Sequence, residues 1–402
     1  MPVTGSITTR FIDEKGLDLG KTLIEKDYLI SVYPNIVNQL DTPMLMVWGN
    51  NGYGRLGDNT IVNKSSPVQT IAYGANWKQV FVGQFHSAAL KTDGTLWTWG
   101  YNGYGNLGDN TITFRSSPVQ TIAGGTNWQQ VSSQRTGSSG IKIDGTLWCW
   151  GYNSNGQLGD NTITHRSSPV QTVAFGTNWK QVSSGAFNTA GIKSDGTLWL
   201  WGKNDNGQLG DNTITKRSSP VQTIAFGTNW KQISCGYQAT AAVKTDGTLW
   251  VWGQNINGQL GDNTFASKSS PVQTIAGGSN WKQVSCGQTH MAAIKTDGTL
   301  WIWGDNTNGQ LGDNTTTRRL SPVQTIVFGT NWKQVSCGSS SHTAAIKADG
   351  TLWAWGNNSS GQLGDNTITS RSSPVQTILY GQNWKNVSNV GEHTAAIKDG
   401  DF

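Results

Sequence analysis

The sequence is poor in charged residues and above all in glutamate. Charged side chains make up 13% of the 402 residues, and glutamate occurs only as Glu14, Glu25 and Glu392. A glycosidase-like pair of carboxylates would have to be built from aspartates, and nearly every aspartate after position 41 falls in a repeated turn. A phosphate-binding loop and a Gly-x-Ser-x-Gly nucleophile turn are also missing. We therefore predict a non-enzymatic protein without catalytic residues, cofactor or metal.

Long apolar runs and clusters of basic residues are missing as well. No stretch of about 18 apolar residues occurs, so no helical membrane span is expected. Residues 1–16 contain no apolar core of the signal-peptide kind. The net charge of +5 is spread along the chain, whereas nucleic-acid binding requires clustered Lys and Arg. We expect no membrane span and no nucleic-acid partner.

Cysteine is rare, with four residues in the chain. Cys235, Cys286 and Cys337 occupy the same Ser-Cys-Gly motif at intervals of 51 residues, and serine fills that position in other copies, as at Ser133 and Ser184. A position that accepts either residue requires small size rather than thiol chemistry. We predict buried free thiols in a reducing compartment, and no disulfide or metal site.

What the sequence does contain is one motif written seven times between residues 41 and 402. Its clearest marker is a Trp-Gly pair, which recurs at intervals of 51 residues five times and 52 residues once. The seven tryptophans of these pairs are Trp48, Trp99, Trp150, Trp201, Trp252, Trp303 and Trp355. A fixed period of this size indicates stacked or radial supersecondary units.

Each copy predicts about four short strands. An Asp-Gly pair such as Asp93-Gly94 stands between two β-prone segments, which is a strong hairpin signal. A Gly/Asn-rich loop ending in Gly-Asp-Asn follows, and then the segments SSPVQTI, NWKQVS and HTAAIK or their variants. Four strands in a period of about 40–50 residues is typical of a propeller blade.

All 20 tryptophans belong to the repeat, in the motifs Trp-Gly, Thr-Leu-Trp and Asn-Trp. Large aromatic residues at fixed strand positions fit faces packed between neighbouring blades. The alternative that remains open is a ring of sugar-stacking platforms built from the Asn-Trp tryptophans.

The ends of the repeat predict a closed ring. The last copy stops after Asp399-Gly400, and the strand that it lacks is found only at the front, as Met44–Gly49. We expect Leu45, Val47 and Trp48 of this strand to complete the last blade, which removes free sheet edges. The predicted organisation is an arm at residues 1–42 and an all-β seven-bladed β-propeller at residues 43–402.

The motifs WGxNxxGQLGDN, SPVQT, VSCGxxHTAAIK and DGTLW resemble the repeats of the regulator-of-chromosome-condensation family. The resemblance covers about 360 residues and implies a seven-bladed β-propeller closed by a terminal strand. It implies less about function, because that family includes exchange factors, ubiquitin-ligase scaffolds and many uncharacterised proteins. Nucleotide exchange depends there on insertions and acidic loop residues, so it is not expected from loops as uniform as these.

Two sets of repeated polar residues are candidates for a binding role. A cation precedes the Ser-Pro motif in every copy, and a ring of such cations could bind an anionic surface, unless each one pairs with the Asp six residues earlier. These cations are Lys64, Arg115, Arg166, Arg217, Lys268, Arg319 and Arg371. Four histidines share one strand position, where we expect structural, hydrogen-bonded side chains rather than metal ligands. They are His86, His290, His342 and His393.

The largest departures from the repeat, at residues 135–138 and at the extra serine of residues 339–341, look too small to build a pocket.

Residues 1–42 do not repeat, and their apolar residues have spacings consistent with one helical stripe that ends at Pro34. The segment DLGKTLIEKDYLISVYP resembles the short N-terminal anchors of tailed-phage structural proteins. The expected anchor residues are Phe11, Leu23, Ile24, Tyr28, Leu29, Val32 and Tyr33. The alternatives for this segment are a strap lying across the propeller and a disordered segment.

From the arm and the uniform ring we predict a virion structural protein of a tailed phage. It would be a decoration, neck, tail or fibre-associated adhesion module, made in the host cytoplasm. Its partners would be other virion proteins, bound through residues 1–42, and a host-surface glycan or protein. The alternative is an intracellular, cytoplasmic propeller-family scaffold or regulator that binds a protein, and a third hypothesis is a propeller lectin.

Overall fold

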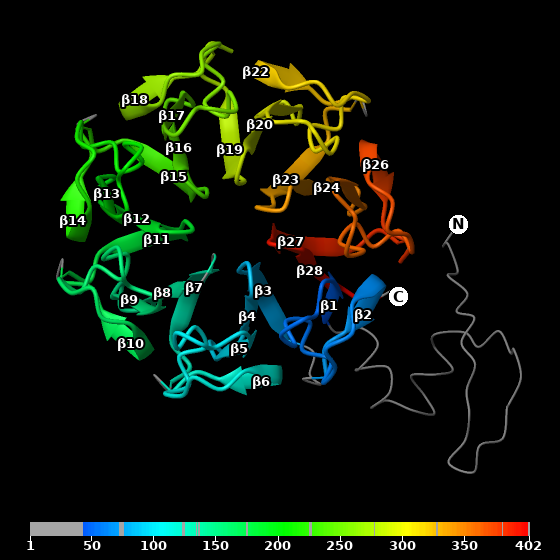
Figure 1. The fold of residues 1–402 in the computed structure, drawn as a ribbon, viewed down its shortest axis with the longest axis horizontal. Coiled ribbons are helices and arrows are strands. Elements are labelled where there is room, and N and C mark those ends of the chain that lie inside the picture. The colour runs from blue at the N-terminus through cyan, green and yellow to red at the C-terminus, as the bar shows by residue number, and fades with distance from the viewer. Residues whose placement is uncertain are drawn as a thin grey trace, which may run out of the picture.

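The structure, a computed structural model, describes residues 43–400 except 72–75, 123–124, 134, 136, 174–175, 225–226, 277, 327–328 and 380. These residues form 28 strands and no helix. The strands make seven four-stranded sheets arranged as blades around a central axis (Figure 1). The predicted seven-bladed all-β propeller is confirmed, while the expected arm at residues 1–42 lies outside the described part of the chain.

Each blade has four antiparallel strands, ordered from the axis outward (Figure 1). The innermost strands are β3 (Trp77–Val82), β7 (Trp128–Ser133), β11 (Trp179–Ser184), β15 (Trp230–Cys235), β19 (Trp281–Cys286), β23 (Trp332–Cys337) and β27 (Trp384–Val390). The second strands are β4 (His86–Lys91), β8 (Gly137–Lys142), β12 (Asn188–Lys193), β16 (Ala239–Lys244), β20 (His290–Lys295), β24 (His342–Lys347) and β28 (His393–Lys398). The third strands are β1 (Met44–Gly49), β5 (Leu96–Gly100), β9 (Leu147–Gly151), β13 (Leu198–Gly202), β17 (Leu249–Gly253), β21 (Leu300–Gly304) and β25 (Leu352–Gly356). The outermost strands are β2 (Lys64–Gln69), β6 (Arg115–Gln120), β10 (Arg166–Gln171), β14 (Arg217–Gln222), β18 (Lys268–Gln273), β22 (Arg319–Gln324) and β26 (Arg371–Gln376).

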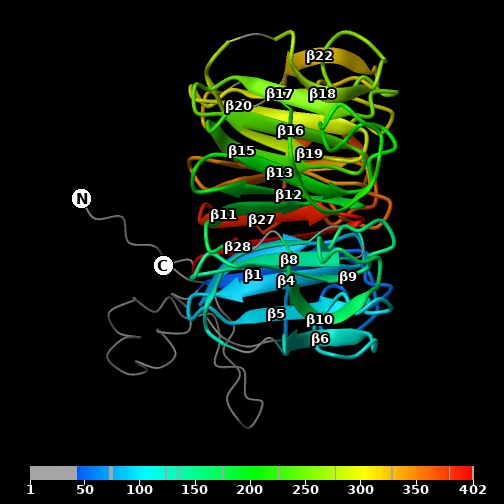
Figure 2. The same cartoon turned by 90° about the vertical axis from the view of Figure 1, so that its left-hand side faces the viewer.

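The ring has two faces of different construction, which Figure 2 shows from the side. The hairpin face carries the Asp-Gly turns between second and third strands and the connections from one blade to the next. The loop face carries the connections from the first to the second strand and the long Gly/Asn loops that lead to the outermost strand.

The N-terminal strand closes the ring, as the sequence predicted. β1 pairs with β28 over its whole length, from Met44 opposite Lys398 to Gly49 opposite His393, and the order in this closing blade is β2-β1-β28-β27. Leu45, Val47 and Trp48 of β1 are fully buried. Every blade thus has four strands, and the third strand of the closing blade comes from the other end of the described chain.

Local sequence explains why each copy folds as a blade. In the Asp93-Gly94 turn, Gly94 has a φ of +79°, a conformation that costs glycine little. The Asp93 carboxylate accepts hydrogen bonds from the backbone N–H and the hydroxyl of Thr95, at 2.9 and 2.7 Å. The same arrangement in later copies confirms the predicted hairpins.

Tryptophans fill the spaces between blades. Trp99 is fully buried, and its indole N–H donates to the Arg55 carbonyl oxygen of the preceding blade at 2.8 Å. A Cβ at Gly57 would lie 2.8 Å from Trp99 Nε1, so this loop position requires glycine. Trp332 and Trp355 pack edge-to-face with ring centroids 6.2 Å apart, an arrangement worth about 0.5–1.5 kcal/mol beyond apolar burial.

Amide and hydroxyl side chains link the inner strands of neighbouring blades. Gln130 Oε1 accepts from the Val182 N–H at 3.1 Å, and Ser132 Oγ accepts from the Ser184 N–H at 2.9 Å. Equivalent side chains bridge five further blade junctions. These paired bonds satisfy backbone donors that would otherwise be buried without a partner.

The junction between β3 and β7 differs from the other six. Gln79 Oε1 has no hydrogen-bond partner among the described residues, and Phe81 occupies the position that serine holds in the other copies. Phe81 packs against the apolar cluster that contains Trp128 and Val131 instead. The contact between β3 and β7 therefore lacks the two side-chain hydrogen bonds found between the other inner strands, and apolar packing takes their place.

Candidate partner-binding face

The seven predicted ring cations lie on the outermost strands, and each pairs with the aspartate of its own Gly-Asp-Asn loop. Arg319 Nη2 lies 2.7 Å from Asp313 Oδ2, and the lysines stand slightly farther away, with Lys64 Nζ 3.6 Å from Asp58 Oδ2. The other five pairs repeat this geometry. Because each positive charge is balanced locally, the ring presents little net charge. Anion binding by these cations stays a prediction.

The aspartates of these pairs organise the loops. Asp109 accepts hydrogen bonds from Asn102 Nδ2, from the Thr111 N–H and hydroxyl, and from Arg115 Nε. Burial alone would raise the pKa of Asp109, but these hydrogen bonds hold it below its usual value. The carboxylate is thus a structural charge that fixes the path of the loop.

The four repeated histidines form hydrogen bonds between blades. His86 Nε2 lies 2.8 Å from Ser138 Oγ, and His290 Nε2 lies 3.0 Å from Thr343 Oγ1. Burial lowers the pKa of His86 to about 3, with Arg55 contributing, and the pKa of His290 to about 4. Both rings are therefore neutral at physiological pH, as expected for structural side chains.

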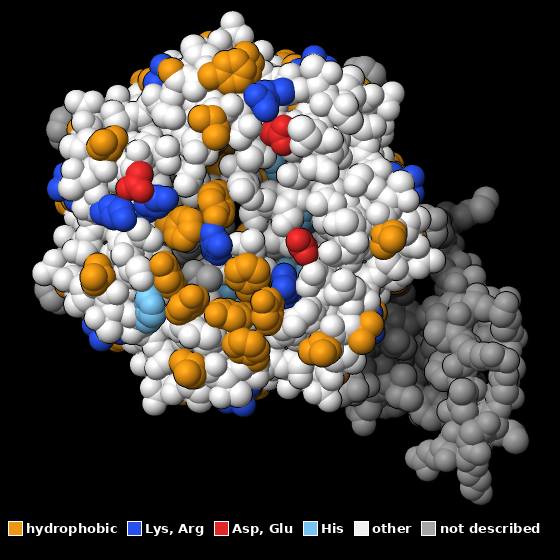
Figure 3. All heavy atoms as spheres, viewed as in Figure 1, with side chains coloured by type: hydrophobic (Ala, Val, Ile, Leu, Met, Phe, Trp, Pro, Cys, Tyr) orange, Lys and Arg blue, Asp and Glu red, His pale blue; other side chains and the backbone are white. Residues whose placement is uncertain are grey.

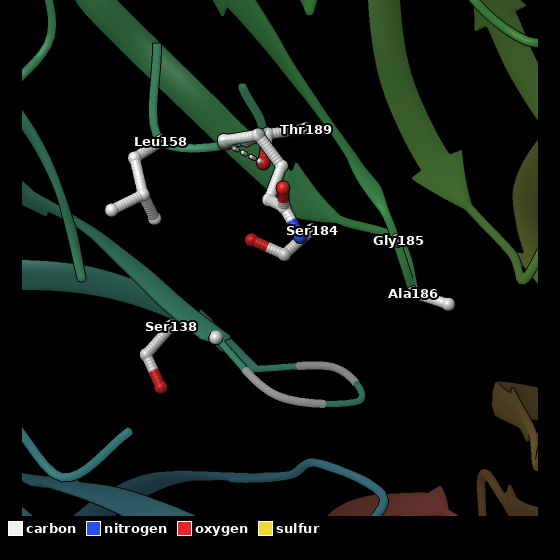
Figure 4. A pocket seen from close by; sticks show the side chains of 8 residues that line it. Ser138, Leu158, Ser184, Gly185, Ala186 and Thr189 are labelled. Atoms are coloured by element: carbon white, nitrogen blue, oxygen red, sulfur yellow. Dashed lines mark hydrogen bonds between the residues drawn. The ribbon is translucent and has the colours of Figure 1, made fainter. Parts of the chain in front are cut away.

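Three blades lack this histidine, and one of them contains a small cavity nearby. Gly137 stands at the histidine position of β8, and a cavity of about 10 Å³ lies beside it, lined by Ser138, Leu158, Ser184 and Thr189 among others (Figure 4). Thr189 donates to the Gln157 carbonyl oxygen at 2.9 Å, so its hydroxyl is already bonded. A cavity of this size holds at most about one water molecule, which makes it no candidate for a ligand site.

The tryptophans proposed as sugar platforms are not available for stacking. The seven Asn-Trp tryptophans are between 1% and 3% exposed. The Thr-Leu-Trp rings are half-buried, and lysines cover them, as where Lys91 Nζ lies 5.0 Å from the Trp77 ring and 4.8 Å from the Trp97 ring. The lectin hypothesis based on these residues is therefore wrong.

A cluster of aromatic side chains on the loop face was not foreseen from the sequence. Hydrophobic side chains gather near the centre of this face over β3–β5 (Figure 3). Successive ring centroids lie 5.2 Å apart between Tyr53 and Tyr101, 6.0 Å between Tyr101 and Tyr104, and 4.9 Å between Tyr104 and Tyr152. The cluster, here called the aromatic patch, consists of the linked rings Tyr53, Phe85, Tyr101, Tyr104, Phe114 and Tyr152 and of the pair Phe187 and Tyr237, which joins them through Arg135.

Two arginines are part of this patch. The Arg55 guanidinium stacks over Tyr53 and Phe85, 5.3 and 5.6 Å from their ring centroids. Arg135 stacks over Phe187 and Tyr237, 5.1 and 5.4 Å away, and its Nη1 donates to the Tyr237 hydroxyl. Neither guanidinium forms an ion pair with a carboxylate of the described residues, in contrast to the seven ring cations.

The patch contains a pocket of about 170 Å³, lined by Tyr53, Phe85, Tyr101, Tyr104 and Arg135. These side chains come from the loops of three neighbouring blades, namely the β1–β2, β3–β4, β5–β6 and β7–β8 connections. The segment at residues 135–138, which looked too small to build a pocket, contributes to one after all, since Arg135 forms a wall. Taken alone the segment is too short, and it gains a role only beside the aromatic loops of the neighbouring blades.

The rim of the same face carries exposed apolar residues, and one repeated loop position is apolar in six of the seven blades. Ile61, Ile112, Ile163, Ile214 and Ile368 are each between 67% and 69% exposed, and Phe265 is 53% exposed. They follow the Asp-Asn-Thr segment of the long loops, where solvent would favour polar residues. The loop face therefore combines an apolar rim with an aromatic centre.

The described part of the chain lacks the side-chain arrangements that hold metal ions or activate thiols. It contains no cluster of three His, Cys, Asp or Glu side chains that could hold a metal ion. No described helix has the length and apolar character needed to cross a membrane. The four cysteines are buried and form no disulfide bond, and burial raises the pKa of Cys235 to about 12, so these thiols are not activated nucleophiles.

Comparison with known proteins establishes the family. Residues 164–401 match the family model of the RCC1-like domain, and residues 45–90, 77–106 and 93–135 match regulator of chromosome condensation (RCC1) repeats. The chain belongs to the RCC1-like family. The ultraviolet-B receptor UVR8 of Arabidopsis thaliana is 32% identical over 336 residues, which cover 81% of this chain and 76% of UVR8. The mitochondrial RCC1 domain-containing protein RUG3 of the same plant is 27% identical over 373 residues, 82% of this chain and 81% of that protein.

Solved structures agree with this RCC1-like fold. Human WBSCR16 superposes with a TM-score of 0.81 at 20% identity, covering 90% of this chain and 100% of that one. Prp20p of Saccharomyces cerevisiae also gives a TM-score of 0.81, at 19% identity, with 90% and 93% covered. At these identities the likeness concerns the fold.

These relatives overturn the predicted function. We expected a virion protein of a tailed phage, but the relatives of this RCC1-like chain named above are proteins of a plant, human and yeast, and none of these four is a phage protein. The virion hypothesis was wrong because it rested on a short likeness within residues 1–42. Those residues, including the seven expected anchor residues, lie outside the described structure.

Proposed function

We propose that this chain is a non-enzymatic, intracellular regulator or scaffold of the RCC1-like family that binds a protein partner on its loop face. The aromatic patch with its two unpaired arginines carries this proposal. Aromatic residues and arginine are enriched at the centres of protein interfaces, where they contribute much of the binding free energy. Elsewhere the repeats are nearly uniform, so the aromatic patch is the part of the surface that departs most from the repeat.

The relatives support a binding role. UVR8 is named as a receptor, and Prp20p is described with binding properties to Gsp1p and histones. The eukaryotic relatives also favour a location inside the cell over the virion that we first expected. Which protein this chain binds does not follow from those relatives, because the patch residues are substitutions of its own repeat.

Site-specific photo-crosslinking tests the proposal with a matched pair of positions. Ile112 on the loop face and Ile143 beside an Asp-Gly turn on the hairpin face are 67% and 68% exposed. A photoreactive amino acid at position 112 is expected to yield a discrete protein adduct in cells, whereas the same residue at position 143 yields none. Adducts from position 143 alone, or equal adducts from both, would overturn the proposal.

A further inference from the structure

We infer that the pocket of the aromatic patch receives one apolar side chain from a partner segment that carries a carboxylate beside it. This inference rests on the proposed function and names the chemistry of the partner. The three features that lead to it are the size of the pocket, the nature of its walls and the unpaired charge at its edge.

The size favours a single side chain. The pocket volume of about 170 Å³ is below the roughly 300–1,000 Å³ typical of sites for cofactors and drug-sized ligands. It suits an anchoring residue of a protein partner, which is how interface hot spots are built. The walls that such a residue would touch are the rings of Tyr53, Phe85, Tyr101 and Tyr104, so an apolar side chain matches them.

The charge at the pocket edge favours a carboxylate. Arg135 lines the pocket, and its guanidinium is held in place by stacking on Phe187 and Tyr237. A guanidinium fixed in this way can form two parallel hydrogen bonds with one carboxylate, and it has no described acidic partner of its own. A partner segment with aspartate or glutamate next to its apolar anchor can fill the pocket with the apolar side chain and bind the Arg135 guanidinium with the carboxylate.

Arg55 places a second positive charge beside the pocket, because its guanidinium stacks on the wall residues Tyr53 and Phe85. Its side chain is 4% exposed, its Nη1 donates to the Gln84 carbonyl oxygen at 2.8 Å, and its Nε has no partner among the described residues. All six equivalent positions in the other copies hold neutral amides, such as Gln157 and Gln208. The nearby Glu392 carboxylate, which Asn50 Nδ2 hydrogen-bonds at 2.8 Å, partly balances the charge of Arg55. Arg135, which has no described acidic partner, remains the main positive charge at the pocket wall.

A peptide selection tests the inference directly. A random seven-residue peptide library is selected on the full chain and counter-selected on Arg135→Ala, and enriched peptides are then synthesised and measured by fluorescence anisotropy. We expect enrichment of aspartate or glutamate adjacent to one large apolar residue. Arg135→Ala should weaken binding of these peptides about tenfold or more. Added salt should weaken their binding to the parent chain, because it screens the attraction between Arg135 and the carboxylate. Peptides with Asn for Asp, or Ala for the apolar anchor, should lose binding in the same way.

Matched variants separate the pocket from general charge effects. Arg318→Ala removes another arginine of the loop face, one that pairs with Asp305 at 4.0 Å, and should leave peptide binding unchanged. Arg135→Glu should reverse the preference and select basic peptides. Unchanged thermal unfolding of each variant shows that the propeller is intact.

The inference is overturned if the selection enriches neutral or basic peptides, enriches none, or enriches acidic peptides that bind either Arg135→Ala or Tyr101→Ala as tightly as the parent chain. The proposed function is judged separately by the crosslinking experiment. A partner captured at position 112 that binds Arg135→Ala normally would leave the proposed function standing and refute the acidic anchor.

Discussion

His393 Nε2 lies 2.9 Å from Ser87 Oγ, and this hydrogen bond joins the closing blade to the β3–β6 blade across 306 residues of sequence. Ser87 donates its own proton to the Arg55 carbonyl oxygen at 2.8 Å. The histidine must therefore be the donor, with its proton on Nε2 and an unprotonated Nδ1. Burial and the positive charge of Arg55 keep the pKa of His393 well below its ordinary value, which fits this neutral form.

Replacing His393 by alanine should destabilise the ring by about 2–4 kcal/mol, because a fully buried side chain and its hydrogen bond are both lost. Urea denaturation followed by tryptophan fluorescence measures the change. His165→Ala is the control, since His165 is exposed on the loop face, and it should cost less than about 1 kcal/mol. Equal losses for the two variants would contradict the role of the inter-blade bond.

Lowering the pH from about 6.5 to 4 should already destabilise the propeller, because buried histidines are neutral in the fold. Burial lowers the pKa of His342 to about 3 and that of His290 to about 4, so between about pH 4 and 6.5 only the unfolded chain takes up these protons. The free energy of unfolding should therefore fall with decreasing pH in this window, by about 1.4 kcal/mol per pH unit for each histidine. Urea titrations at several pH values should show a smaller slope for His290→Gln than for the parent chain. An unchanged slope would show that His290 is not neutral in the fold.

Removing the two partners of a rim ion pair should have unequal effects. Asp313 is nearly buried and accepts bonds from Asn306, Thr315 and Arg319, whereas the Arg319 side chain is 34% exposed. We expect Asp313→Ala to cost about 2–4 kcal/mol, because buried donors lose their acceptor, and Arg319→Ala to cost about 0–1 kcal/mol. Thermal and urea unfolding of both variants provide the measurement. Similar losses would mean that the charge pair, rather than the loop network, is what matters.

Hydrogen exchange should identify the junction between β3 and β7 as the weakest in the ring. The Val182 and Ser184 amides donate to side chains of the preceding blade, while the equivalent amides of Val131 and Ser133 face Gln79 and Phe81 without such a bond. Exchange at Val131 and Ser133 should be about tenfold faster or more, which corresponds to about 1.4 kcal/mol of protection. Phe81→Ser, which restores the residue type of the other blades, should slow exchange at Ser133. Equal protection at all four amides would contradict this assignment.

A glycine beside a buried histidine should be intolerant of a methyl group. A Cβ at Gly338 would lie 2.6 Å from the Nδ1 and Cε1 atoms of His342. Gly338→Ala should therefore destabilise the protein by about 1–3 kcal/mol through overpacking. Gly52→Ala serves as the control, since its nearest contact would be the Asn50 side chain at 3.3 Å. Denaturant midpoints compare the two variants, and a tolerated Gly338→Ala would show that His342 can move away.

The fold was predictable because the repeat encodes it in every copy. Turn chemistry at Asp93-Gly94 and the fixed tryptophans each point to the same four strands, and the lone strand at Met44–Gly49 identifies the closure. The local pairing of Arg319 with Asp313 could also be foreseen from a constant spacing of six residues. Predictions of strands, turns and local ion pairs are strong in a regular repeat, because the same residues recur at the same spacing in every copy.

The binding face was not predictable by the same means. Tyr53, Phe85 and Arg135 stand at variable loop positions, where single departures from a repeat resemble random substitution. Only the closure of the ring brings their three blades together at one pocket. A signal was present, since five of the nine tyrosines replace polar loop residues, but it becomes meaningful only when the loops are mapped onto one face.

The six-residue strand β1 completes the closing blade, whose two inner strands, β27 and β28, come from the C-terminal end of the described chain. In a dilute solution each molecule fills this gap with its own strand. During refolding at high concentration, a second molecule can donate the strand instead, with the same hydrogen bonds on both sides. Preparations refolded from denaturant will therefore contain reciprocal dimers in a proportion that rises with protein concentration. Once formed, such dimers persist, because releasing the exchanged strands requires opening two blades at once.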